Sequence, residues 1–130
     1  MPTPTTARFT GVHTVAIPVR DQDAALAFYH ATLGLQARFD AELQPGFRWI
    51  ELAPPDADTS LALVPAGDAL PAGVDTGIRL VTPDASAAHA ALTDAGADVG
   101  ELLLWDTAPP MFSFRDPDGN TLYVSEAPSA

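Results

Sequence analysis

Hydrophobic and polar positions in the first half of the chain predict a strand, a helix and three further strands, in that order. Val15, Ile17 and Val19 alternate with other residues, as they do in a half-buried strand. Apolar residues then recur at helical spacing from Ala25 onward, until Gly34, a residue type that commonly ends helices. Three strand-like runs follow, at residues 35–39, 47–53 and 59–64.

The second half of the chain repeats this order. Thr82 is expected to follow a strand at residues 77–81 and to cap a helix that has Pro83 at its first position and ends at Gly96. The buried stripe of that helix is expected to consist of small or apolar residues: Ala88, Ala91, Leu92 and Ala95. Three more strand-like runs follow it: residues 99–105, 111–115 and 121–126. The sequence therefore predicts one domain, residues 1–130, that contains two β-α-β-β-β modules, residues 10–65 and 75–127.

Each module is expected to form a small sheet with its helix on the outer face, which makes the fold class α+β. The face under the helices is apolar and carries Val15, Ile17, Ile50, Leu52, Ile78, Leu80, Leu122 and Val124. By the two-residue period of strands, the opposite face carries Thr14, Ala16, Trp49, Glu51, Ala62, Gly77, Arg79, Thr121, Tyr123 and Ser125. A mostly apolar face with a few charged and aromatic groups is typical of a ligand cavity. We expect its shape to depend on loops at residues 40–45, 65–74 and 106–110.

Composition excludes several classes of function. The chain has 17 acidic and 6 basic residues, for a net charge of −11, which argues against nucleic acid and anionic membranes as partners. It has no Cys and no Lys, so thiol and Schiff-base chemistry are excluded. Residues 1–6 lack the features of a signal peptide, and no apolar run reaches 18 residues. We expect a cytoplasmic protein.

Three segments carry a resemblance to a known family: residues 17–21, residues 27–35 with a Phe-Tyr pair and a Leu-Gly-Leu run, and residues 114–120 with Asp-Pro-Asp-Gly. Together they resemble the vicinal oxygen chelate superfamily, which includes glyoxalase I, extradiol dioxygenases, fosfomycin-resistance enzymes and bleomycin-resistance proteins. The resemblance covers residues 10–127. It implies paired modules that form a cupped, barrel-like mixed sheet with helices outside, a homodimer, and a divalent metal in the cup of the enzyme members.

The resemblance also assigns four metal-ligand positions by spacing from shared residues. In this sequence they fall on Thr14, Ala62, Gly77 and Tyr123. None of these is a usual ligand for Zn²⁺, Fe²⁺ or Ni²⁺. We therefore expect no metal site and no cofactor.

Three residues near those positions keep a metal-dependent alternative open. His13 lies one residue before a ligand position, and alternation points it away from the cup unless a β-bulge turns it back. Glu126 lies three residues past the ligand position at Tyr123, and we expect it to be an exposed carboxylate near the strand end. Glu51 faces the cup but lies on a strand that provides no ligand in the family. A shifted site would use His13 with Glu51 or Glu126.

The candidate ligand-binding residues are those that alternation places in the cup: Thr14, Trp49, Glu51, Arg79, Met111 and Tyr123. Glu51 and Arg79 are expected either to form a structural ion pair or to anchor a ligand. Glu51 and Tyr123 are also the candidate catalytic residues, with Glu51 as a base whose pKa burial would raise. Trp49, Tyr123 and Met111 either line the cavity or pack between the modules.

Four hypotheses follow. The first is a metal-free dimer, resembling bleomycin-resistance proteins, that binds a small organic molecule in the cup. The second is a lyase, isomerase or dioxygenase with the shifted metal site, and the third is a metal-free acid–base enzyme. The fourth is an interaction module whose cup is filled by its own side chains. The sequence leaves open the identity of the ligand and whether one chain or two form the cup.

Overall fold

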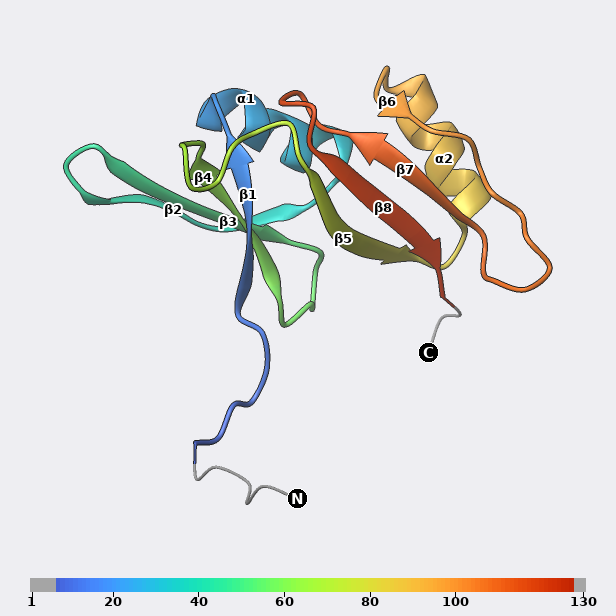
Figure 1. Cartoon of the computed structure of the whole chain (residues 1–130), viewed down its shortest axis with the longest axis horizontal. Coiled ribbons are helices and arrows are strands. Elements are labelled where there is room, and N and C mark those ends of the chain that lie inside the picture. Colours follow the sequence, from blue (N-terminus) through green and yellow to red (C-terminus); the bar gives the residue numbers. More distant parts are fainter. Residues whose placement is uncertain (1–6, 128–130) are drawn as a thin grey trace.

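The computed structural model describes residues 7–127 and contains the two β-α-β-β-β modules that the sequence predicts (Figure 1). The first module runs through β1 (Thr14–Val19), α1 (Gln22–Ala27), the π-helical turn η1 (Phe28–Thr32), β2 (Gln36–Gln44), β3 (Phe47–Ala53) and β4 (Ser60–Pro65). The second runs through β5 (Asp75–Thr82), α2 (Ala85–Asp94), β6 (Asp98–Val99), β7 (Met111–Arg115) and β8 (Thr121–Glu126). No helix within residues 7–127 is long and apolar enough to cross a membrane.

Each module forms its own four-stranded mixed sheet, with the order β1-β4-β3-β2 in the first and β5-β8-β7-β6 in the second. The first and last strands of each module are parallel neighbours, and the other pairs are antiparallel. The α+β fold is confirmed. The two sheets curve but do not close into a barrel.

Both helices begin at an aspartate. The Asp21 carboxylate accepts a hydrogen bond from the Ala24 amide (3.1 Å), and the Asp84 carboxylate accepts one from the Ala87 amide (3.0 Å). The prediction that Thr82 caps the second helix was wrong, because Thr82 is still the last residue of β5. An aspartate in extended conformation before the first turn satisfies an amide that the helix leaves unpaired.

Two strand boundaries also differ from the prediction. Residues 40–44, expected in a loop, continue β2 and pair with β3 up to a turn at Gly46, whose φ of +80° favours glycine. The run at residues 99–105 is strand only at its start, and one further bridge joins Leu103 to Met111. Both boundaries depend on hydrogen bonding between strands, which the local sequence does not predict.

The core lies between the helix-covered faces of the two sheets. Ile17, Ile50, Leu52 and Leu122 are fully buried there, and Val15, Ile78 and Leu80 pack against the same cluster, as expected. Phe28 of η1 lies against Phe114 of β7, with ring centroids 6.3 Å apart. The first helical segment therefore packs on the second sheet, and the two modules share one core. In the predicted stripe of α2, Leu92 is buried and Ala88 half-buried, but Ala91 and Ala95 are exposed.

A buried polar network joins the modules beside this core. The Tyr29 hydroxyl donates to an Asp116 carboxylate oxygen (2.8 Å), and the Asn120 amide donates to the same oxygen (3.0 Å) and to the Pro18 carbonyl (2.7 Å). The Asn120 side-chain oxygen accepts hydrogen bonds from two backbone amides of the inter-module loop. This burial and hydrogen bonding raise the pKa of Tyr29, so its hydroxyl stays protonated and keeps donating.

Candidate functional site

The face of the first sheet that no helix covers is aromatic and polar. Trp49 and Glu51 lie on it in β3, and the pairing of β2 with β3 places Phe39 opposite Glu51. Residues directly opposite each other in a sheet share a face, so Phe39 belongs to this surface too. The sequence analysis missed Phe39 because it ended the second strand there. Phe39 and Phe47 are both 41% exposed.

The Glu51 carboxylate on this face accepts hydrogen bonds from two side chains. The Trp49 indole nitrogen donates to its Oε2 (2.7 Å), and the Ser60 hydroxyl donates to its Oε1 (2.7 Å). The Glu51 side chain is 14% exposed. Ser60 is buried, and the sequence analysis missed it as well. It is the first residue of β4 and lies beside Thr14, and no pattern in the sequence distinguishes a serine at such a position.

These hydrogen bonds, from Trp49 first and Ser60 second, lower the pKa of Glu51 despite its partial burial. Hydrogen bonds to the charged form stabilise that form. The expectation that burial raises this pKa was wrong. A carboxylate held in its charged form is a weak base, so the arrangement favours anchoring a ligand over abstracting a proton.

His13 lies beside this carboxylate rather than on the opposite face. Its Nε2 is 3.5 Å from Glu51 Oε1, and its side chain is 81% exposed. Alternation did not predict this orientation because His13 precedes β1 and is not bound by its two-residue period.

The uncovered face of the second sheet has a second polar cluster. The Arg79 guanidinium lies 4.5 Å above the centre of the Tyr123 ring, and the Tyr123 hydroxyl donates to an Asp75 carboxylate oxygen (2.6 Å). The bond to Asp75 raises the pKa of Tyr123. The ion pair considered for Glu51 and Arg79 is absent from the contacts of the described residues, since each side chain is held within its own sheet.

The remaining sequence candidates lie around these two clusters. Met111 pairs with Ser125 and is half-buried, and Thr14 is half-buried beside Ser60. Glu126 accepts a hydrogen bond from the Ala85 amide (3.0 Å), so it completes the N-terminal turn of α2 instead of lying free as expected.

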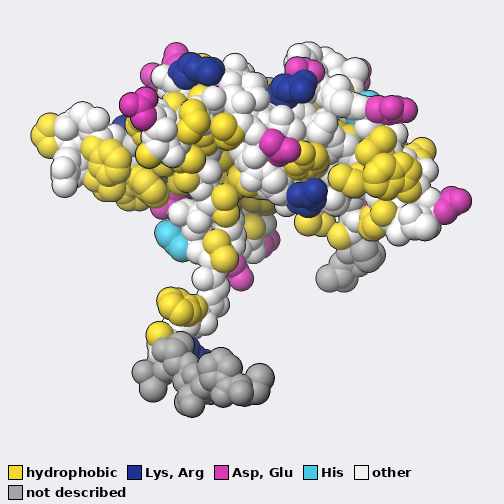
Figure 2. All heavy atoms as spheres, viewed as in Figure 1, with side chains coloured by type: hydrophobic (Ala, Val, Ile, Leu, Met, Phe, Trp, Pro, Cys, Tyr) yellow, Lys and Arg dark blue, Asp and Glu magenta, His cyan; other side chains and the backbone are white. Residues whose placement is uncertain are grey.

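Within residues 7–127, the two polar faces do not meet. For residues 7–127, every hydrogen bond and ring contact found for Trp49, Glu51, Arg79 and Tyr123 stays within one module. The helix-covered faces share the core, which leaves the opposite faces turned outward. Apolar side chains gather over the β2–β3 end and over the loop before β7 (Figure 2), where Leu43, Leu104 and Trp105 are more than half exposed. One chain thus presents two separate polar faces, one on each sheet.

The donor groups at the four metal-ligand positions do not suit a divalent cation. Ala62 and Gly77 have no donor side chain, and Thr14 and Tyr123 offer only hydroxyls. Within residues 7–127, no three His, Asp or Glu side chains lie close enough to hold a metal ion. The pair formed by His13 and Glu51 supplies two of the donor groups that a metal site needs.

The fold, with its two β-α-β-β-β modules, defines a class of protein, and sequence comparison agrees with it. The chain belongs to the Glyoxalase/Bleomycin resistance protein/Dioxygenase superfamily, whose family model matches residues 11–124. No curated protein matches the sequence closely enough to be called a relative.

Several solved structures are similar over nearly the whole chain. A superfamily member from Sphaerobacter thermophilus DSM 20745 is 35% identical, with 92% of this chain and 98% of that chain covered and a TM-score of 0.84. TnmS3, an antibiotic binding protein from Streptomyces sp. CB03234, is 33% identical, with coverages of 95% and 99% and a TM-score of 0.84. A glyoxalase/bleomycin resistance protein from the same Streptomyces strain is also 33% identical, with coverages of 88% and 99% and a TM-score of 0.77.

Proposed function

We propose that this protein binds a small organic molecule without a metal, in a cup that two copies of the chain form together. One wall of the cup is the Trp49–Glu51 face of one copy. The other wall is the Arg79–Tyr123 face of its partner. The observation that carries the proposal is the Glu51 carboxylate, which Trp49 and Ser60 hold in its charged form on an otherwise aromatic surface.

This surface favours a ligand with a flat ring and a cationic or hydrogen-bond-donating group. The rings of Phe47 and Trp49, with centroids 6.2 Å apart, offer a stacking surface next to Glu51. Each carboxylate oxygen can accept more than the one hydrogen bond it receives from Trp49 or Ser60. The net charge of −11 also attracts cations. TnmS3, described as an antibiotic binding protein, supports the same class of function.

The unpaired edges of β1 and β5 support a homodimer. In the described part of the chain, β1 pairs only with β4 and β5 pairs only with β8, so each leaves one edge open. Open strand edges beside exposed apolar side chains are surfaces that a partner covers. Pairing β1 of one copy with β5 of the other would bring the two polar faces together.

Ligand binding can be followed through one tryptophan. The chain has two, so Trp105→Phe leaves Trp49 as the single reporter. We expect bleomycin or another antibiotic from a panel of flat aromatic compounds to quench Trp49 fluorescence with saturation, equally with and without EDTA. Sedimentation should show a dimer. A monomer, or a panel in which no compound quenches Trp49, would contradict the proposal.

The closeness of His13 to Glu51 favours one alternative, a shifted metal site in a lyase, isomerase or dioxygenase. That alternative expects one tight Fe²⁺, Ni²⁺, Zn²⁺ or Mn²⁺ ion per chain, which is lost in His13→Ala. The metal-free proposal expects no tight ion in either protein. Metal content after exposure to each ion and gel filtration separates the two.

A further inference from the structure

We propose that Arg48 is a positioning residue for the ligand site: it ties the β2–β3 hairpin to helix α1 and so fixes the aromatic surface formed by Phe47 and Trp49. The proposal rests on the ligand binding proposed above and deepens it, because it names the contact that orients one wall of that site. Arg48 acts through the two aromatic residues that adjoin it in β3.

The outer part of the β2–β3 hairpin, residues 40–49, projects beyond the rest of its sheet as a ribbon of two strands (Figure 1). Within residues 7–127, β3 pairs with β4 at Glu51 and Leu52, whereas its pairing with β2 continues out to Phe47. Every residue of β2 is exposed. A two-stranded ribbon by itself is at best marginally stable in water, so its direction depends on contacts with neighbouring elements.

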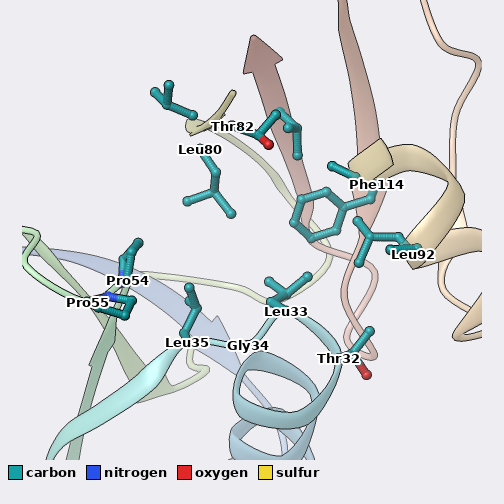
Figure 3. Close-up of a pocket in the computed structure, with 14 residues that line it drawn as sticks. Thr32, Leu33, Gly34, Leu35, Pro54, Pro55, Leu80, Thr82, Leu92 and Phe114 are labelled. Carbon is teal, nitrogen blue, oxygen red and sulfur yellow. The ribbon is translucent and has the colours of Figure 1, made fainter. Parts of the chain in front are cut away.

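An apolar cavity of about 360 Å³ borders the base of this hairpin (Figure 3). Leu35, directly before β2, and Pro54, directly after β3, line one side of it. Leu80, Leu92 and Phe114 of the second module line the other side. Because this space separates the base of the hairpin from the second module, the direction of the hairpin depends on contacts within the first module.

Arg48 makes such a contact with α1. The two-residue period of β3 points its side chain to the helix side of the sheet, opposite to Phe47 and Trp49. Its Nη1 donates a hydrogen bond to an Asp23 carboxylate oxygen in the first turn of α1 (2.7 Å). Its Nε and Nη2 donate to the two carboxylate oxygens of Asp40 in β2 (2.8 and 2.9 Å). One guanidinium therefore joins both strands of the hairpin to the helix.

The backbone of Arg48 is tied to the same turn of α1. The Gln22 side-chain amide donates to the Arg48 carbonyl (3.0 Å) and to the Leu63 carbonyl of β4 (2.9 Å). The hydrogen bonds from Arg48 also lower the pKa of Asp40, so this pair stays charged at neutral pH. Since the aromatic residues adjoin Arg48 on both sides, these contacts set where the stacking surface lies relative to Glu51.

The test compares Arg48→Gln with Arg38→Gln in the full-length protein. Arg38 lies in the same hairpin and its replacement removes the same charge, but its guanidinium donates to the Pro54 carbonyl instead of to α1. Ethidium, a flat aromatic cation, is the probe because it belongs to the ligand class proposed above, and fluorescence titration gives its affinity. We expect Arg48→Gln to weaken ethidium binding by about three- to fivefold, which is the most that an exposed ion pair shifts an equilibrium, and Arg38→Gln to leave it unchanged.

Asp23→Asn breaks the contact with α1 and leaves the pair of Arg48 and Asp40 in place. We expect the same weakening of ethidium binding, and no further weakening in the Arg48→Gln, Asp23→Asn double variant, because both changes remove one contact. Hydrogen exchange of the backbone amides of residues 41–49 should become faster by the same factor in these variants. Exchange in the second module should not change, which separates positioning of the hairpin from a general loss of stability.

The other outcomes overturn the proposal. Unchanged hydrogen exchange in Arg48→Gln would mean that Arg48 does not hold the hairpin. Faster exchange with unchanged ethidium affinity would mean that the direction of the hairpin has no effect on binding. Additive weakening in the double variant would mean that Arg48 and Asp23 act separately. Absence of ethidium binding in every protein, wild type included, would contradict the proposed ligand class, and the exchange rates would still decide whether Arg48 ties the hairpin to α1.

Discussion

Replacing Asn120 with alanine is expected to lower the free energy of unfolding by about 4 kcal/mol, since each buried polar group left unpaired costs about 1–3 kcal/mol. The Asn120 side chain is fully buried and makes hydrogen bonds to the Pro18 carbonyl, the Asp116 carboxylate and two loop amides. Alanine removes all of these bonds and supplies no hydrogen-bonding group in their place, so the buried groups that Asn120 paired with are left unpaired. Because the bonds join both modules and the loop between them, the loss should unfold the chain as one unit.

Chemical denaturation followed by circular dichroism measures this change. Tyr29→Phe removes a single hydroxyl from the same network and should cost less, about 1–3 kcal/mol. Arg115→Ala breaks an exposed ion pair with Asp98 within the second module and should cost at most about 1 kcal/mol. An Asn120→Ala protein no less stable than Arg115→Ala would show that the network does not hold the modules together.

Replacing Glu51 with glutamine is expected to weaken the affinity for whichever antibiotic quenches Trp49 by about 10- to 100-fold. A hydrogen bond to a charged group contributes about 1.5–3 kcal/mol, and about 1.4 kcal/mol corresponds to a factor of ten. Glutamine keeps the size of the side chain, so the aromatic surface around it should stay in place. Glu101→Gln removes an exposed carboxylate and is the matched control for the change in net charge. Equal affinities of the two variants would exclude Glu51 as the anchor.

The same variant tests the charge state of Glu51. Its pKa is lowered in the folded protein, so the carboxylate contributes to stability and to binding above the ordinary glutamate range. That contribution is lost only as the pH falls through the lowered folded pKa, below about 4.3. We expect the wild-type affinity to stay constant from neutral pH down to that range and then fall. The Glu51→Gln affinity should lack this final decrease, and fluorescence titration over pH measures both.

The two-residue period of a strand predicted which face of its sheet a residue lies on, but it did not predict that residue's contacts with distant segments. Glu51 was expected in the cup, but its hydrogen bond to Ser60 depends on β4 lying beside β3, a pairing between distant segments. That contact, with the one from Trp49, reverses the expected direction of its pKa shift. Glu126 was expected to be exposed, but the fold brings the start of α2 to it.

The sequence by itself determined the repeated β-α-β-β-β order, the family and the apolar face of each sheet, because hydrophobic period and glycine positions act through local backbone geometry. Only the tertiary structure decided which groups hold the Glu51 carboxylate and that His13 lies beside it. It also decided that Phe28 packs on Phe114, so that the modules share a core and their polar faces turn outward. Such contacts join residues far apart in the chain, and they depend on register and packing that no local pattern encodes.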